Sequence, residues 1–208
     1  MKRTAAPHDI LRVFFIYCSK RLTVRERRMF VTVDINDVCN KPACPIALYK
    51  SMQGKYFVGL SREEFGRGKH AWAGLFNPPD SGVLLFVNVF TVSDVSEVPF
   101  SFQVWLNAVV QGPARLTDMQ SPSNVAICPL PKPQVQFLFA ENVDAEPLGG
   151  TLIFGRRCPA ETTVVSEEDG KFILPPGGNF LINLLPPEES ENKILGRIAY
   201  GWWEEPCE

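Results

Sequence analysis

Short apolar runs separated by proline and glycine recur along most of this chain. The 208 residues include 18 Pro and 15 Gly, and these stand between the apolar runs as punctuation. No window from residue 55 to residue 208 shows an apolar repeat of helical period with capping residues. Chains of this kind form many short strands joined by tight turns. We therefore predict an all-β fold, an antiparallel, jelly-roll-like β-sandwich.

The run at residues 83–92 is apolar almost without interruption. Strict alternation places Val83, Leu85, Val87 and Val89 on one face, and Leu84, Phe86, Phe90 and Val92 on the other, broken only by Asn88. A strand with one wet face should alternate with polar residues. This strand is therefore predicted to be central in a two-layer core or to be covered on its outer side. The cover is either residues 36–54 or a second subunit, and we favour the second subunit.

Other segments give clearer strand signals. Residues 100–110 alternate between apolar and polar side chains, with Trp105 on the polar side. Further strands are predicted at residues 55–60, 71–76, 134–140, 149–157 and 192–205, the last with Ile194, Ile198, Tyr200 and Trp202 on one face. Residues 175–185 are predicted to be a turn followed by a strand. Residues 61–70 read as a polar loop, and residues 162–174 as a hairpin turning at Asp169-Gly170.

Charge separates a basic N-terminal arm from an acidic remainder. Residues 1–28 carry eight Lys or Arg against two acidic residues, whereas the remainder carries 13 basic and 21 acidic residues. This basic arm fits a partner-binding or membrane-surface segment, a disordered non-core tail, or sequence upstream of a start at Met29 rather than Met1. Residues 29–54 form a loop-rich lead-in, and residues 55–208 the β-sandwich domain.

The apolar residues of the arm do not form a targeting or membrane signal. The run "VFFIYC" at residues 13–18 is short and no cleavage site follows it, so no signal peptide is recognised. No run approaches the ~20 apolar residues that a membrane-spanning helix needs. We predict no transmembrane segment and, because the net charge is −2, no nucleic-acid partner.

Six cysteines give no complete framework. Cys39 and Cys44 are close enough for a small disulfide loop or half of a metal site, but no second close pair exists. Cys18, Cys128, Cys158 and Cys207 are scattered along the chain. Reduced thiols are favoured, with a Cys39–Cys44 disulfide or cross-links between chains as alternatives, and no metal is predicted.

Catalytic signatures are weak. The two histidines are His8 in the arm and His70, which could act with Glu63 and Glu64 as an acid–base pair or a weak metal site. An exposed loop histidine is the simpler interpretation. Neither a nucleophile elbow nor a phosphate loop occurs. Glu167, Glu168 and Asp169 fit a solvated turn better than a calcium site. We predict no enzyme and no cofactor.

Four tryptophans are the candidate interface or ligand residues: Trp72, Trp105, Trp202 and Trp203. Trp105 lies on the polar side of its strand. Adjacent Trp202 and Trp203 must point to opposite faces, so one of them is expected to leave the core. An exposed tryptophan anchors a subunit contact or stacks on a sugar ring.

Residues 56–205 resemble an uncharacterised family of small proteins from endospore-forming bacteria. The matching segments are "AWAGLFNPPDSGVLLFVNVFTVS", "CPLPKP", "LPPGGNF" and "AYGWWEE". More loosely, "LFNPPDSGVLLFV" and the terminal "WWEEP" resemble β-sandwich components of phage particles. The resemblance implies a structural or surface role and brings no catalytic residues.

These expectations combine into one functional hypothesis. We expect a non-enzymatic protein that self-associates as a homo-oligomer or docks on a larger assembly, such as a spore layer or virion, after synthesis in the cytoplasm. The alternative is a carbohydrate-binding β-sandwich module.

Overall fold

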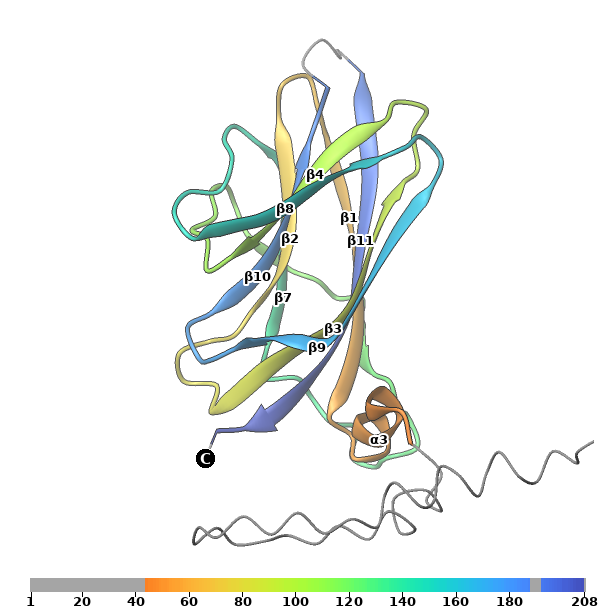
Figure 1. The fold of residues 1–208 in the computed structure, drawn as a ribbon, viewed down its shortest axis with the longest axis vertical. Coiled ribbons are helices and arrows are strands. Elements are labelled where there is room, and N and C mark those ends of the chain that lie inside the picture. Colours follow the sequence, from red (N-terminus) through yellow and green to blue (C-terminus); the bar gives the residue numbers. More distant parts are fainter. Residues whose placement is uncertain (1–43, 188–191, 208) are drawn as a thin grey trace, which may run out of the picture. The chain divides into compact units, whose positions relative to one another are not determined.

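The computed structural model describes residues 44–187 and 192–207. Within them, one short helix precedes eleven strands that form two facing sheets (Figure 1). The elements are α3 (Ile46–Met52), β1 (Tyr56–Gly66), β2 (His70–Phe76), β3 (Val83–Asp94), β4 (Phe100–Leu106), β5 (Arg115–Leu116), β6 (Gln120–Pro122), β7 (Gln136–Val143), β8 (Thr151–Cys158), β9 (Thr163–Leu174), β10 (Asn179–Leu185) and β11 (Lys193–Pro206). No helix among the described residues is long and apolar enough to cross a membrane.

The strand order is that of a jelly roll. The five-stranded sheet runs β6-β1-β11-β3-β9, and the six-stranded sheet runs β5-β7-β2-β10-β4-β8. Eight strands remain when the short or additional strands β5, β6 and β7 are left out. One sheet is then β1-β11-β3-β9, which are strands 1, 8, 3 and 6 of the eight in chain order. The other is β2-β10-β4-β8, which are strands 2, 7, 4 and 5. Every pairing is antiparallel. This double Greek-key arrangement confirms the predicted antiparallel, jelly-roll-like sandwich.

The main core lies between the two sheets, where alternate residues of facing strands meet. On β4 the inward residues are Phe100, Phe102 and Val104, as the alternation predicted. On β11 the predicted face is also confirmed, since Ile194, Ile198, Tyr200 and Trp202 are all buried in this core. Period-two patterning was therefore a reliable guide wherever a strand is regular.

Strand β3 departs from strict alternation at one residue. Leu85 and Val87 point inward, but so do Phe90 and Val92, because a bulge at Asn88 interrupts the pairing with both neighbours. One inserted residue exchanges the two faces of the strand beyond it. The prediction that Val89 shares a face with Val87 was therefore wrong, and the buried residues form one continuous inward face.

Strand β1 extends through residues predicted to be a polar loop. The strand reaches Gly66, and only residues 67–69 form a turn. Ser61 and Glu63 point inward between Phe57 and Phe65 and are completely buried. The loop prediction was wrong because these two polar residues occupy core positions, where polarity is a poor guide to structure.

The predicted hairpin at Asp169-Gly170 is a bulge within β9. Both halves of β9 pair with β3, and residues 168–171 form the extra loop between them. Asp169 and Gly170 both have positive φ angles, 50° and 76°. A Cβ atom at Gly170 would lie 1.9 Å from Trp203 Cη2, so only glycine allows this close approach. The sequence therefore placed the turn correctly. The chain does not reverse there, however, because β9 continues along β3 after the turn.

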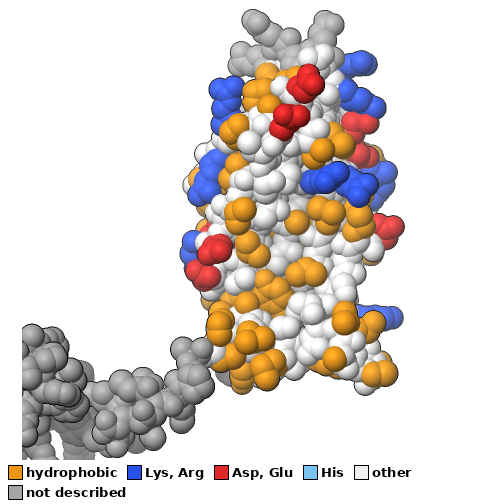
Figure 2. Space-filling model, turned by 90° about the vertical axis from the view of Figure 1, so that its right-hand side faces the viewer, with side chains coloured by type: hydrophobic (Ala, Val, Ile, Leu, Met, Phe, Trp, Pro, Cys, Tyr) orange, Lys and Arg blue, Asp and Glu red, His pale blue; other side chains and the backbone are white. Residues whose placement is uncertain are grey.

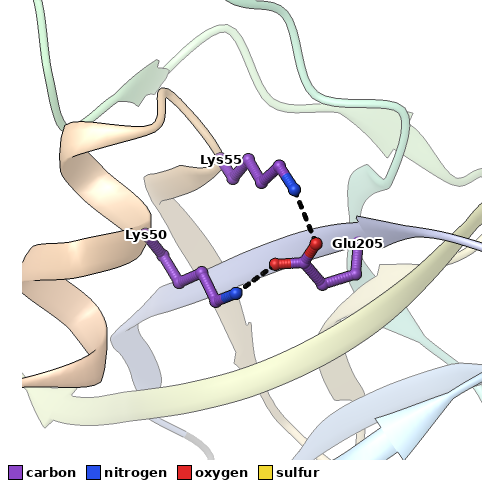
Figure 3. Close-up of polar contacts among 3 residues, drawn as sticks. All are labelled: Lys50, Lys55 and Glu205. Carbon is purple, nitrogen blue, oxygen red and sulfur yellow. Dashed lines mark hydrogen bonds and ion pairs between the residues drawn. The ribbon is translucent and has the colours of Figure 1, made fainter.

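The lead-in contains a helix where loop was predicted. Helix α3 follows Pro45, and none of its residues is buried. Its Lys50 forms an ion pair with Glu205 at the end of β11, and Lys55 Nζ lies 2.6 Å from the same carboxylate (Figure 3). The hydroxyls of Ser123 and Ser51 lie 2.8 Å apart. The basic arm, His8, Cys18 and Cys39 lie outside the described residues.

Candidate interaction surfaces

Two of the four candidate tryptophans, Trp72 and Trp202, are buried within the domain. Trp202 lies in the main core against Phe57 and Phe137, and its Nε1 donates to Glu204 at 3.1 Å. Trp72 is also buried, on the opposite side of the six-stranded sheet from that core. Both indole N–H groups are satisfied, since Trp72 Nε1 donates to the Gln111 carbonyl at 2.7 Å. Neither ring is available to a partner in this conformation.

Trp203 leaves the space between the sheets but stays covered. It lies on the outer side of the five-stranded sheet, where its ring stacks on Phe86 with centroids 5.1 Å apart and planes 9° from parallel. The Gly170 bulge closes over its edge, and only 4% of the residue is exposed. The pair does point to opposite faces, as expected. A partner is not needed to bury Trp203.

The outer side of the five-stranded sheet, which we call the bare face, is rich in apolar side chains. Its cross-strand rows are Tyr56–Trp203–Phe86–Ile173, Val58–Gly201–Val89–Glu167 and Leu60–Ala199–Thr91–Val165. Val58 is 42% exposed and Ile173 is 52% exposed. Figure 2 shows hydrophobic side chains along this side, with charged side chains mostly along its two margins and upper end. A flat, mainly apolar area with a charged rim is typical of a contact surface.

A shallow groove borders the bare face. It has a volume of about 460 Å³ and lies between β1 and residues 118–121. Val58, Leu60 and Met119 supply most of its apolar lining. The groove extends the apolar area beyond the edge of β1.

The outer side of the six-stranded sheet, which we call the covered face, has a core of its own. Trp72, Leu181 and Ala140 of the sheet pack with Ala108 and Val143. Residues 107–113 and 143–150 supply the cover, and two backbone hydrogen bonds between Val109 and Leu148, of 2.8 and 2.9 Å, join them. Apolar residues on this face therefore pack against the chain's own loops.

Trp105 is the candidate tryptophan that keeps partial exposure. It lies on the covered face, and its Nε1 donates to Gln103 Oε1 at 3.0 Å. Its cross-strand partner Leu152 is exposed, as are Val109 and Leu148 on the covering segments. This smaller patch offers an aromatic ring beside an amide side chain, which suits a sugar or a small apolar contact.

The candidate acid–base residues do not come together. His70 begins β2 on its outer side, and partial burial lowers its pKa, although Glu146 and the Leu184 backbone act in the opposite direction. Glu63 faces the core, whereas Glu64 points outward and pairs with Lys193. No group of three His, Cys, Asp or Glu among the described residues could hold a metal ion.

The acidic residues near the bulge and the C-terminus make structural contacts. Glu168 is buried, accepts from Ser166 at 2.6 Å and pairs with Lys171 at 2.7 Å, so the solvated-turn expectation was wrong for this residue. Burial raises the pKa of Glu204, although it accepts from the Gln134 amide, Trp202 and the Val135 amide. Partial burial acts to raise the pKa of Glu205, but Lys50 and Lys55 hold it below its usual value.

Glu63 is a buried acid that the sequence did not reveal. Neither carboxyl oxygen has a hydrogen-bond partner among the described residues. The nearby Ser61 hydroxyl donates to the Ile198 carbonyl at 3.3 Å. Burial raises the pKa of Glu63 to about 8, an effect that Ser61 reduces and Glu141 increases. The available signal for burial of Glu63 was its place on the same alternating face as Phe57 and Phe65. The polar composition of residues 61–64 made that alternation hard to recognise.

The fold and its surfaces define a jelly-roll β-sandwich with one apolar outer face left bare by the described residues. The chain belongs to a family of unknown function, DUF6143, whose profile matches residues 32–208. No curated protein and no solved structure matches it. Membership of an uncharacterised family confirms that part of the resemblance.

Proposed function

We propose that this protein is a non-enzymatic structural component that self-associates through its bare face. The observation that carries the proposal is the partial exposure of the outward residues of β1, β3 and β9, including Val58, Phe86 and Ile173. Soluble monomers rarely leave a large contiguous apolar area open to water. Burial of such an area against another protein supplies the free energy of association.

The bare face is large enough for a stable contact. Four strands spaced by about 4.8 Å, each contributing about 11 residues at about 3.3 Å, give an area of roughly 700 Å². A standard interface buries about 800 Å² on each partner. Side chains and the groove beside β1 add to the area calculated from the backbone, so the area of the bare face is close to that of a standard interface.

A second copy is the partner that fits best. The centre of the bare face carries small or apolar residues such as Gly201, Ala199 and Val89. The same face also carries Glu167 at the β9 edge and Arg62 beside Arg197 beyond the apolar rows, so a second copy must leave these charges outside the contact or pair them with opposite charges. A two-fold axis would place the same patch on both sides of the contact. By its sequence resemblance, the larger assembly that we propose is a spore layer or a virion.

The test is the mass of the full chain in solution, measured by size-exclusion chromatography with light scattering, with and without reductant. We expect the wild type to be oligomeric under both conditions. Val58→Glu and Ile173→Glu should each give folded monomers, because a charge at either position would be buried by the partner. Leu116→Glu is the matched control, since Leu116 is 57% exposed but lies on β5 of the other sheet.

A second candidate function depends on Trp105. If the wild type is a monomer at high concentration, self-association through the bare face is excluded. Retention on a polysaccharide that Trp105→Ser abolishes would then support the carbohydrate-binding alternative. The partly exposed indole beside Gln103 is the observation that favours it.

A further inference from the structure

Two arginines lie side by side on the outer side of the five-stranded sheet. Arg62 of β1 and Arg197 of β11 are direct cross-strand partners, beyond the apolar rows of the bare face. Both point outward, because their chain neighbours Ser61, Glu63 and Ile198 are buried on the inward side. The Cβ atoms of such partners lie about 4.5–5.5 Å apart. The two guanidinium groups can therefore reach the same point above the sheet.

This arginine pair is unfavourable by itself. Like charges directly opposite each other on neighbouring strands destabilise a sheet. No ion pair among the described residues includes either guanidinium. In addition, Nε of Arg197 is buried and has no hydrogen-bond partner among those residues. A buried donor without an acceptor costs free energy. An anion between the two guanidiniums would remove both costs.

The carboxylates near the pair in the strand register belong to other contacts. Glu64, the next outward residue of β1, pairs with Lys193. Asp94 of β3 is buried, and its Oδ1 accepts from the Ser96 amide and hydroxyl at 2.8 and 2.6 Å. Asp118 lines the groove beside β1, and no ion pair joins it to the arginines. The described residues therefore do not supply the missing anion.

Two hydroxyl groups extend the same cross-strand row. Ser93 of β3 is the partner of Arg197 on its other side, and Thr163 of β9 is the partner of Ser93. The two hydroxyl oxygens lie 2.8 Å apart, so one hydroxyl donates to the other. The accepting hydroxyl keeps its own hydrogen for a further acceptor. The row thus offers two guanidinium groups and one hydroxyl donor.

We propose that Arg62, Arg197, Ser93 and Thr163 form a binding site for a tetrahedral oxyanion, a phosphate or sulfate group. Two guanidiniums match the charge of about −1.5 to −2 that a phosphate group carries at neutral pH. A guanidinium binds such a group through two parallel N–H···O bonds. A phosphate has enough oxygens for both guanidiniums and the hydroxyl, whereas a carboxylate has only two. The site rests on contacts within one chain and not on self-association.

The bound group belongs either to a free ion or to an ester. Leu60 is the outward residue before Arg62, about 7 Å away at about 3.3 Å per residue, and it lines the groove beside β1 with Val58 and Met119. An ester can therefore place an apolar group in this groove. Asp118 in the groove disfavours a second negative charge there, so the ester should carry a single anionic group.

The test is isothermal titration calorimetry of the full chain with sodium phosphate at neutral pH and constant ionic strength. Sodium chloride is the blank titrant, and sodium sulfate and phenyl phosphate are the other probes. We expect saturable binding of one phosphate or one sulfate per chain. Arg62→Gln and Arg197→Gln should each weaken it at least about tenfold, because each removes charge-assisted hydrogen bonds. The Arg197 Nε–H signal in nuclear magnetic resonance spectra should shift during the titration.

Arg157→Gln is the matched control. Arg157 is exposed on β8 of the other sheet, and this change alters the net charge by the same amount. It should leave phosphate binding unchanged, and circular dichroism should show that all three variants are folded. Tighter binding of phenyl phosphate than of phosphate would support the site with an ester as its ligand. Equal or weaker binding would support it with the free ion.

Three results would overturn the site. The first is the absence of saturable phosphate or sulfate binding to the wild type. The second is binding that neither Arg62→Gln nor Arg197→Gln weakens. The third is an equal loss for Arg157→Gln, which would mean that the anion responds only to the net charge of the protein. Light scattering on the same samples reports self-association separately, so failure of the site and failure of the bare-face contact are distinguishable.

Discussion

The two outer faces of the sandwich differ in how their apolar side chains are shielded from water. Both sheets carry large apolar side chains on the side away from the main core, such as Trp72 on one and Phe86 on the other. On the covered face, residues 107–113 and 143–150 close over the apolar side chains and form a second core. On the bare face, Trp203 is covered by its neighbours within the sheet, but Val58 and Ile173 remain exposed.

This difference shows that outward apolar residues alone do not identify a contact surface. Trp72 and Leu181 would look like interface residues in a sequence, yet the chain covers them itself. What distinguishes the bare face is the absence of a covering segment among the described residues. A contact with a partner should therefore depend on the bare face, whereas domain stability should depend more on the covered face.

The largest effect is expected on the covered face. Trp72→Ala should lower the free energy of unfolding by about 3–5 kcal/mol, because it removes a buried indole and leaves a cavity under the loops. Chemical denaturation followed by circular dichroism measures this loss. Trp72→Phe, which keeps part of the ring volume, should lose clearly less. A loss below about 1 kcal/mol for the alanine variant would mean that the second core contributes little.

A smaller, pH-dependent effect is expected between the two faces, at Glu63. Its folded pKa of about 8 lies above the ordinary value of 4.5, so the unfolded state releases its proton first. The wild-type free energy of unfolding should therefore fall as pH rises from 4.5 to 8 and then level off.

Glu63→Gln removes that titration. Its stability relative to the wild type should increase across this range, by on the order of a few kcal/mol in total. Denaturation curves at several pH values between 4.5 and 8 give the comparison. Trp72→Ala serves as the control, because its stability difference should not follow the Glu63 titration. A Glu63→Gln difference that is constant with pH would mean that the carboxyl ionises normally in the folded protein.

The smallest effect on the domain is expected on the bare face. Ile173→Ala, measured under conditions where the wild type is monomeric, should lower the free energy of unfolding by less than about 1 kcal/mol. The same change should weaken self-association, which dilution followed by light scattering measures. If the isolated domain instead lost more than about 2 kcal/mol, this position would already be well packed, and the contrast between the two faces would disappear.

The sequence by itself determined the fold class and most of the regular strands. Proline and glycine placed the turns, and alternation identified the inward residues of β4 and β11, such as Phe102 and Tyr200. Trp202 and Trp203 were also correctly expected to point in opposite directions. These inferences succeeded because a strand's period of two is a local property, and a regular strand shows it without reference to its neighbours.

Only the tertiary structure decided where that period breaks and what covers each face. The bulge at Asn88 interrupts the pairing of β3 with both β9 and β11, and the Gly170 loop lies against the ring of Trp203 on the neighbouring strand. Glu63 became a core residue because β11 continues to pair with β1 beyond the apolar run. Such contacts depend on which parts of the chain meet in the fold, and no local pattern of residues contains that information.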